Sequence, residues 1–383
     1  MASFPPPPVN TIDWTDIGFR MREVNGHIES HYSVSSGKWT EPEFVESPYL
    51  RLHGMAPALN YGQQCYEGLK AFRGPGDKAI SIFRPDLNAA RLQHSASFIS
   101  IPEVPIEHFL RCVRLAVGLN AAYVPPHDTG AALYIRPLLF GSSAQLGLAP
   151  PQEYTFCVFV LPTGVYHGTA PVDALILEAF DRAAPHGTGS AKVGGNYAPV
   201  LRWSESAHKE GYGITLHLDS ATRSVVDEFS TSGFVGAKVG PGGVGGGDVT
   251  LVVPDSENVI ESVTSASVCA IAEAWGWKVE KRPIPYEELP EFTEVMAAGT
   301  AAALVPIKSI AMKSKGDKFL YREGSDEAGP VITRLLSQLK GLQLGKVEDK
   351  FSWLDRVEKP VEGSFLRRDA VENGNVKEVG DLP

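Results

Sequence analysis

Residues 187–199 read G-T-G-S-A-K-V-G-G-N-Y-A-P, and this stretch isolates one lysine, Lys192, among small residues. Three small residues precede the lysine and three follow it, so the backbone there can approach other groups closely. A lysine amine that a tight apolar site desolvates can act as a nucleophile toward carbonyl groups. On these residues alone the alternative is a solvated lysine in a Gly-rich turn, because clusters of glycine are first of all turn signals.

The composition is that of an ordinary globular chain. Its 383 residues exceed the size at which a single core usually stops growing, so about two domains are expected. The formal net charge of -10, without any basic stripe, argues against nucleic-acid and anionic-membrane partners. No apolar run has the length of a membrane span and the first residues do not resemble a signal peptide, so we expect a cytoplasmic location.

The four cysteines, Cys65, Cys112, Cys157 and Cys269, are widely spaced. None of them forms a C-x-x-C pair, so neither a disulfide framework nor a zinc site is indicated, and we expect no metal. We interpret these cysteines as small buried apolar side chains.

Apolar patterning predicts an α/β fold of the α+β type with strands and helices in both halves. Strands are expected at 79–83, 131–140, 154–161, 175–180, 213–219, 235–239 and 249–253, and helices from Asp86, at 106–122 and at 196–209. Pro and Gly interrupt the pattern within 163–172, which we interpret as an interdomain linker. The expected domains are then 1–162, with an extended Pro-rich start at 1–12, and 173–383, with an irregular C-terminal tail.

Two segments could bind a phosphate. Residues 240–245 match G-x-G-x-x-G, but a strand-like segment follows them where a dinucleotide-binding motif requires a helix. A helix is expected to start after Ser262 or Thr264, and its first N–H groups could receive an anion. By itself this helix start is better interpreted as a structural cap.

Seven segments together resemble the branched-chain amino-acid aminotransferases, a class IV family. Residues 187–199 are similar to the family's K-x-G-G-N-Y segment, and residues 61–73, Y-G-Q-Q-C-Y-E-G-L-K-A-F-R, resemble its Y-x-x-Q-x-F-E-G-x-K-A-F. Residues 83–91, F-R-P-D-L-N-A-A-R, resemble its F-R-P-x-x-N-x-x-R. Shorter matches follow in the expected order at 134–137 (Y-I-R-P), 228–232 (E-F-S-T-S), 263–264 (V-T) and 299–301 (G-T-A). The resemblance implies a pyridoxal 5'-phosphate (PLP) enzyme of fold type IV, with a small N-terminal domain, a larger cofactor domain and a homodimeric assembly.

The resemblance also implies a role for each matched residue. Lys192 would form the Schiff base with PLP and move a proton during catalysis. Glu228, whose charge would be costly among its apolar and small neighbours without a partner, would pair with the protonated ring nitrogen. Its neighbour Asp227 would be structural or solvated. The other implied cofactor contacts are Tyr197 at the phenolate oxygen, Arg91, Val263, Thr264 and Thr300 at the phosphate, and Thr231 beside the ring. On the residues alone, Tyr197 is better interpreted as a core tyrosine and Arg91 as a surface arginine.

The implied substrate residues are Tyr61, Tyr66, Tyr134, Arg136 and Tyr166. A mostly aromatic pocket favours apolar side chains. We therefore expect a ping-pong transamination, through pyridoxamine phosphate, from an apolar branched-chain-like L-amino acid to 2-oxoglutarate. The small-molecule partners would be an amino acid or amine and a 2-oxo acid.

Three positions depart from the family pattern. Gly233 stands where many members have Asn, and Ser262 and Ser265 replace the Gly and Arg of G-V-T-R. Residues 299–304 also lack the redox C-x-x-C of some animal members. These departures favour a specialised biosynthetic role. An (R)-amine or D-amino-acid transaminase and an aminodeoxychorismate-lyase-like enzyme remain alternatives, as does a non-catalytic protein, against which the presence of Lys192 counts.

Overall fold

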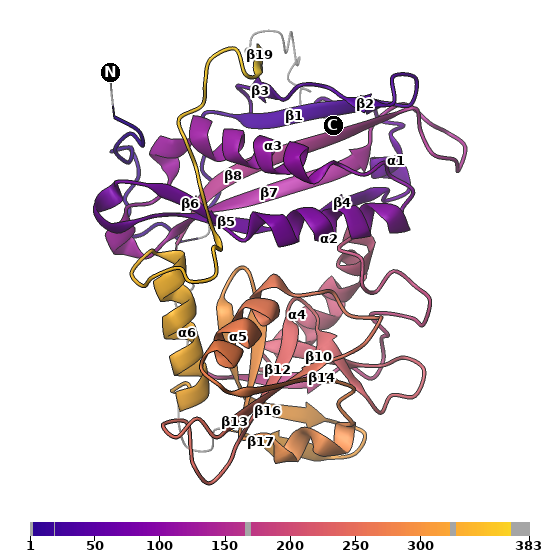
Figure 1. Cartoon of the computed structure of the whole chain (residues 1–383). Coiled ribbons are helices and arrows are strands. Elements are labelled where there is room, and N and C mark those ends of the chain that lie inside the picture. The colour runs from indigo at the N-terminus through magenta and orange to yellow at the C-terminus, as the bar shows by residue number, and fades with distance from the viewer. Residues whose placement is uncertain (1–2, 19, 165–169, 322–326, 369–383) are drawn as a thin grey trace. The chain divides into compact units, whose positions relative to one another are not determined.

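The computed structural model describes residues 3–18, 20–164, 170–321 and 327–368 (Figure 1). The chain forms two compact units. Unit 1 contains residues 1–89, 99–164 and 355–383, and unit 2 contains residues 90–98 and 165–354. Among the described residues, no helix combines the length and the apolar character that crossing a membrane requires.

Unit 1 is built on one mixed sheet with the longest strands at its centre. In order, its strands are β18 (Leu354–Arg356), β6 (Ile80–Phe83), β5 (Leu69–Arg73), β7 (Ala132–Gly141), β8 (Glu153–Thr163), β1 (His27–Ser33), β3 (Glu43–Val45) and β19 (Leu366–Arg368). Two short strands, β2 (Lys38–Trp39) and β4 (Gln64–Tyr66), pair with β1 and β7. The amphipathic helix α3 (Ile106–Leu119) packs its apolar side against β1, β7 and β8. A single-turn helix, α1 (Pro57–Asn60), precedes β4.

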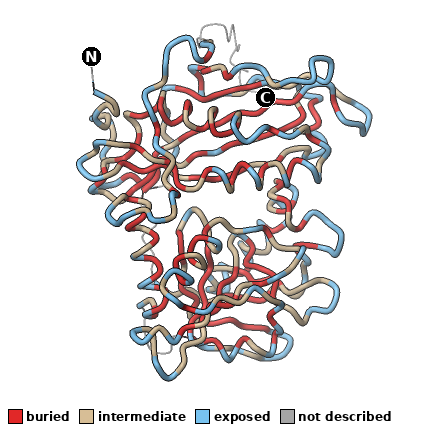
Figure 2. Tube along the Cα trace, viewed as in Figure 1, coloured by how far each residue is buried: buried red, intermediate tan, exposed pale blue. Residues whose placement is uncertain are grey.

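Unit 2 has its own mixed sheet. In order, its strands are β11 (Val226–Phe229), β10 (Ile214–Leu218), β9 (Val172–Ile176), β16 (Ala303–Met312), β15 (Glu294–Gly299), β12 (Gly233–Val239), β13 (Val249–Pro254) and β14 (Lys278–Arg282), with β17 (Asp317–Leu320) beside β16. The helices are α4 (Leu201–Lys209), α5 (Val263–Ala274) and α6 (Pro330–Gln343), and α5 packs against α6, β12, β14 and β15. Buried residues follow the strands in both units (Figure 2), so each unit has a core of its own.

Helix α2 (Pro85–Phe98) is divided between the two units. Its residues 85–89 are part of unit 1, and its residues 90–98 are part of unit 2. The helix begins at Pro85, so Asp86, where the sequence analysis starts it, lies in its first turn. The two units differ in two segments from the domains expected from the sequence, which were divided at 163–172. Residues 90–98 pack with unit 2, and residues 355–368 return to unit 1 as part of β18 and as β19.

Two expected helices differ in extent. The helix at 106–122 stops at Leu119, where the Asn120 side chain donates to the Ala116 carbonyl oxygen at 2.8 Å and ends the turn. The helix expected at 196–209 is present only as α4, from Leu201, after two 3-10 turns at Gly194–Asn196 and Ala198–Val200. Pro199 cannot donate a backbone hydrogen bond, which disfavours a continuous α-helix across these turns.

Two other expectations agree with the structure. The Gly-rich residues 240–247 connect β12 to β13 as an antiparallel hairpin, so the G-x-G-x-x-G match is not followed by a helix. Three of the four cysteines are buried and all four are free, whereas Cys269 is only half-buried.

Candidate active site

Lys192 lies in a loop of unit 2 between β9 and the turn Gly194–Asn196, and its neighbours Ala191 and Val193 are buried. The loop packs tightly against other backbone. At Gly189 a Cβ atom would lie 2.4 Å from the Asn258 carbonyl oxygen, so a larger residue would force the backbone apart. Close packing is therefore the physical reason for a glycine at position 189.

Asn196 holds this loop through its side-chain amide. Its Nδ2 donates to the carbonyl oxygens of Thr188 at 2.7 Å and Ala191 at 2.9 Å, and its Oδ1 accepts from Thr188 Oγ1 at 2.9 Å. These bonds satisfy polar groups that would otherwise be costly to bury, and they fix the carbonyl group immediately before Lys192.

The Lys192 amine contacts the tyrosine that the sequence places with it. Nζ donates to the Tyr197 hydroxyl at 2.9 Å and lies 4.9 Å from the centroid of the tyrosine ring. The turn Gly194–Asn196 reverses the chain between the two residues, which brings the side chains together although they are five positions apart.

The second half of α2 lies against the same loop. His94 Nε2 is 3.2 Å from Ser190 Oγ, and Ser95 Oγ accepts the Lys192 backbone N–H at 2.8 Å. One turn earlier, Arg91 Nη1 donates to the Glu261 carbonyl oxygen at 2.7 Å. A single helix therefore contacts both the lysine loop and Glu261.

Glu261 immediately precedes α5, so Arg91 lies at the N-terminal end of that helix. Ser262 is the N-cap, as one of the two sequence alternatives predicts, and its hydroxyl oxygen accepts the Ser265 N–H at 3.1 Å. The first N–H groups of a helix carry partial positive charge and attract anions. Arg91 and the α5 start, with Val263 and Thr264 as its first residues, thus form a positively polarised corner.

Two further sequence candidates border this corner. Thr300 directly follows β15, whose Ala298 carbonyl oxygen accepts the Ser262 hydroxyl at 3.2 Å. Thr231 precedes β12, and its carbonyl oxygen would lie 3.6 Å from a Cβ placed on Gly299. Both threonines therefore lie at strand ends beside the N-terminus of α5.

Glu228 on β11 is buried, and its partner is an arginine that the sequence analysis did not single out. Arg182 Nη1 lies 2.7 Å from Glu228 Oε1, and the side chains are 2% and 5% exposed. The Ile260 N–H donates to the same oxygen at 3.1 Å. Burial raises the pKa of the Glu228 carboxyl to about 7, although Arg182, Ile260 and Lys192 each act to lower it.

Arg182 also connects the carboxylate to the lysine loop. Its Nη1 donates to the Gly189 carbonyl oxygen at 3.2 Å, three residues before Lys192. A buried carboxylate needs a cation nearby, and that requirement is the signal by which Arg182 could have been sought in the sequence.

Asp227, which the sequence analysis left as structural or solvated, is buried and therefore not solvated. Its Oδ1 accepts the Ser256 hydroxyl at 2.9 Å. Because β11 is buried on both faces, the alternation of side chains does not carry Asp227 to the surface.

Three of the expected substrate residues gather in unit 1. The Arg136 guanidinium carbon lies 5.0 Å from the Tyr66 ring centroid and 5.2 Å from the Tyr134 ring centroid. Arg136 Nη2 donates to the Tyr134 hydroxyl at 3.1 Å. Gly68 leaves room for that hydroxyl, which would be 2.2 Å from a Cβ at this position. The result is an exposed cation between two aromatic rings.

The other two expected substrate residues are placed differently. The Tyr61 hydroxyl donates to the Leu146 carbonyl oxygen, and the tyrosine is 46% exposed. Tyr166 lies outside the described residues.

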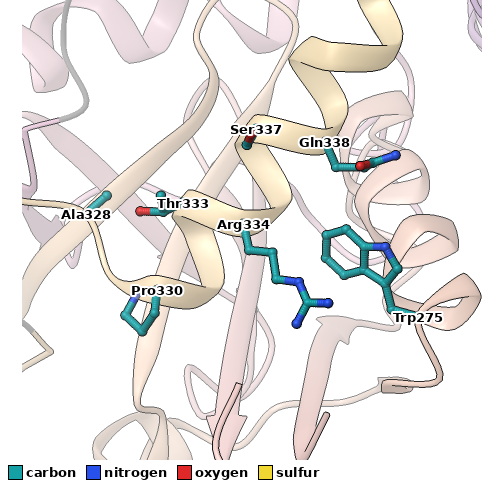
Figure 3. Close-up of a pocket in the computed structure, with 7 residues that line it drawn as sticks. All are labelled: Trp275, Ala328, Pro330, Thr333, Arg334, Ser337 and Gln338. Atoms are coloured by element: carbon teal, nitrogen blue, oxygen red, sulfur yellow. The ribbon is translucent and has the colours of Figure 1, made fainter. Parts of the chain in front are cut away.

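A shallow groove of about 710 Å³ runs beside α6 (Figure 3). It is lined by Trp275, Ala328, Pro330, Thr333, Arg334, Ser337 and Gln338. Trp275 is the C-cap of α5, so the groove lies at the end of that helix opposite to Arg91 and Ser262. It shares no residue with the candidate site.

One group of potential metal ligands occurs among the described residues, formed by Glu29, His31 and Glu43. Arg368 Nη2 lies 2.5 Å from Glu29 Oε2 and 2.6 Å from Glu43 Oε2. The guanidinium thus supplies the positive charge that these carboxylates need, and we do not assign a metal to them.

Comparison with known proteins identifies the family. The model of the amino-transferase class IV family matches residues 64–310, which include the lysine loop, Glu228 and the start of α5. The chain belongs to the class IV aminotransferases. The enzyme class and the family expected from the sequence are therefore confirmed, and PLP dependence is a property of this family.

Two fungal relatives are similar over nearly their whole length. Aminotransferase poxL of Penicillium oxalicum is 54% identical over 93% of this chain and 96% of its own. The branched-chain amino acid aminotransferase gloG of Glarea lozoyensis is 49% identical over 94% of this chain and 99% of its own.

The fold is also that of a solved member. The branched-chain amino acid aminotransferase of Escherichia coli superimposes with a TM-score of 0.71 at 26% identity, covering 88% of this chain and 100% of the other. The expected two-domain α+β architecture of fold type IV is thereby confirmed.

Proposed function

We propose that this class IV aminotransferase binds PLP through Lys192 and transfers the amino group of an apolar, branched-chain-like L-amino acid to 2-oxoglutarate. The observation that carries the proposal is one set of hydrogen bonds. The Lys192 amine is bonded to Tyr197, and its backbone is bonded to the same turn of α2 that places Arg91 at the α5 start.

The residues present fit the chemical groups of PLP. Arg91 and the N-terminus of α5 would hold the phosphate, with Thr300 beside them, because a guanidinium fork and helix N–H groups both bind phosphate. Glu228 is a buried acid that would pair with a protonated ring nitrogen, and Thr231 and Tyr197 would lie beside the ring and its phenolate oxygen. When bound, PLP supplies an electron sink for the electrons of the substrate α-carbon.

The chain's own residues would carry the proton steps. Lys192 Nζ would accept the proton of the substrate α-carbon and would then donate it at C4′, acting first as general base and then as general acid. A cation beside Glu228 would lower its pKa and favour the carboxylate, which in turn holds the proton on the ring nitrogen. Arg182 keeps that carboxylate oriented through its contact with Oε1.

The substrate assignment is supported by two observations. Tyr66 and Tyr134 offer aromatic surface to an apolar side chain, and the exposed Arg136 between them offers a partner for the second carboxylate of 2-oxoglutarate. The relative gloG is named a branched-chain amino acid aminotransferase. The departures at Gly233, Ser262 and Ser265 support a specialised biosynthetic role.

A homodimer is part of the proposal. Unit 1 exposes five apolar side chains on neighbouring segments, Met55, Leu59, Tyr61, Leu146 and Leu148, which we call the apolar patch. The Gln145 N–H donates to the Met55 carbonyl oxygen at 3.0 Å, and Tyr61 is bonded to Leu146, so the two segments lie together. Exposed apolar surface of this kind is typical of protein interfaces. The cytoplasmic location stays a prediction.

The cofactor claim is tested by colour and by reductive labelling. Purified wild-type protein incubated with PLP should be yellow, and borohydride should attach the reduced cofactor to the peptide that contains Lys192. Lys192→Ala should lose both properties. The control, Lys209→Ala, changes an exposed lysine of α4 and should keep them. A wild-type protein that stays colourless with PLP contradicts the proposal.

The substrate claim needs a separate assay. Turnover of leucine, D-alanine and (R)-1-phenylethylamine should be compared with 2-oxoglutarate and with pyruvate as acceptors. We expect leucine with 2-oxoglutarate to give the highest kcat/KM. Activity confined to the D-amino acid or to the amine would assign the chain to one of the alternative branches.

A further inference from the structure

Ser95 lies at the centre of the hydrogen bonds that join α2 to the lysine loop. Its side chain is fully buried, with 0% of the residue exposed. Its Oγ accepts the Lys192 backbone N–H at 2.8 Å and donates to the Arg91 carbonyl oxygen at 2.9 Å. The Ser95 hydroxyl group therefore acts as a donor within the helix and as an acceptor toward the loop.

The peptide group between Ala191 and Lys192 is held at both of its polar atoms. Its N–H is bound by Ser95 Oγ, and its C=O is bound by Asn196 Nδ2 at 2.9 Å. A peptide unit is planar, so fixing both ends fixes the orientation of that plane. The two hydrogen bonds therefore fix the Lys192 N–Cα bond and restrict the directions in which its side chain can leave the backbone.

A serine in a helix often donates to the carbonyl group one turn earlier, and that bond alone has only local meaning. Ser95 differs because its second partner, Lys192, is 97 positions away in the chain. Ser97 on the same helix provides the comparison. Its hydroxyl donates to the His94 carbonyl oxygen at 2.7 Å, and the residue is exposed.

We propose that Ser95 is a positioning residue for Lys192. Together with Asn196, it fixes the peptide group that precedes the lysine and so directs Nζ toward Tyr197. Because Ser95 and Arg91 are on the same turn of α2, it also fixes the position of the amine relative to Arg91. The catalytic consequence of this positioning rests on the proposed function, whereas the positioning itself does not.

The first experiment uses the protein without cofactor. Hydrogen exchange of the Lys192 backbone amide is measured by NMR in wild type, Ser95→Ala, Ser95→Cys and Ser97→Ala. Loss of the buried acceptor should raise the exchange rate in Ser95→Ala by about tenfold or more. Ser95→Cys should give an intermediate rate because a thiol is a weak acceptor of similar size, and Ser97→Ala should match wild type.

The second experiment uses the PLP-loaded protein. The absorbance of the lysine-bound cofactor is titrated against pH, because the midpoint depends on the placement of the lysine nitrogen. We expect the midpoint to shift in Ser95→Ala, to shift less in Ser95→Cys, and to stay at the wild-type value in Ser97→Ala. In Ser95→Ala, kcat should fall by a larger factor than KM changes. A general loss of stability would lower the active fraction without moving the midpoint.

The outcomes separate the two proposals. A colourless wild type would contradict the proposed function, and the exchange rates would still decide the role of Ser95. A yellow protein in which Ser95→Ala leaves both the Lys192 exchange rate and the absorbance midpoint at wild-type values would overturn the role of Ser95 alone. If Ser95→Ala does not fold, the same comparison is decided by Ser95→Cys.

Discussion

At the scale of single residues, the ionisation of Glu228 depends strongly on its surroundings. It is a buried acid with a buried arginine at 2.7 Å, and burial nevertheless raises its pKa to about 7. A folded-state pKa above the unfolded value of 4.5 means that the folded protein binds the proton more tightly than the unfolded chain does. The stabilisation is therefore complete below pH 4.5 and is lost as the pH rises through about 7.

The raised pKa of Glu228 predicts how the unfolding free energy of the cofactor-free protein changes with pH. Between about pH 5 and pH 8, wild type should lose up to about 3 kcal/mol of unfolding free energy relative to Glu228→Gln, which cannot ionise. Denaturant unfolding at several pH values measures the difference in slope. Glu205→Gln, at an exposed glutamate of α4, should keep the wild-type slope. Parallel curves for wild type and Glu228→Gln would contradict the prediction.

At the scale of elements, the three departures from the family pattern form one packed contact between β12 and α5. A Cβ on Gly233 would lie 2.8 Å from Ser265 Oγ and 3.1 Å from Ser262 Cβ. Glycine on the strand and small serines in the first helical turn are therefore physically coupled. The three residues are separated in the sequence, and their contact means that the size allowed at each position depends on the other two.

The coupling predicts a non-additive pair of substitutions. Gly233→Ala should lower the unfolding free energy by about 1–3 kcal/mol because the new methyl group overlaps the helix start. Ser265→Ala removes the nearest atom, so the double variant should recover part of that loss. Denaturant unfolding of the two single variants and the double variant gives the coupling energy. If the effects of the two substitutions on the unfolding free energy are strictly additive, the contact with Ser265 does not limit the size of the residue at position 233.

At the scale of the whole molecule, each unit keeps its own sheet and core, and the chain passes between the units more than once. Residues 90–98 belong to unit 2, and residues 355–368 return to unit 1. Arg368 on β19 lies against Glu29 and Glu43, so its charge helps to hold the returning segment on β3.

The apolar patch of unit 1 predicts the assembly. Introducing a charge at its most exposed residue, with Leu148→Asp, should convert the proposed dimer to a monomer, because an unpaired carboxylate in an apolar interface is costly. Light scattering after gel filtration measures the mass. Leu320→Asp places the same charge on an exposed leucine of β17 and should leave the mass unchanged. A wild-type monomer at micromolar concentration would contradict the dimer.

Much of the fold and part of the site can be predicted because they depend on local spacing. Apolar alternation locates β6, apolar runs locate β7 and β8, and Ser262 marks the start of α5. Lys192 and Tyr197 are five residues apart, and the intervening Gly–Gly–Asn turn brings them into contact. The resemblance to the branched-chain aminotransferases then selects Arg91 and Glu228 as candidate cofactor residues without any knowledge of their spatial partners.

The sequence by itself therefore determines the family, singles out Lys192 and locates most helices and strands, since these follow from motifs and from short-range periodicity. Only the tertiary structure assigns Arg182 to Glu228, Ser95 to Lys192 and Gly233 to Ser265. These partners lie 46, 97 and 32 positions apart in the chain. At such separations nothing in the local pattern selects one polar residue over another, and the contact exists only because the folded backbone brings two buried groups within hydrogen-bonding or packing distance.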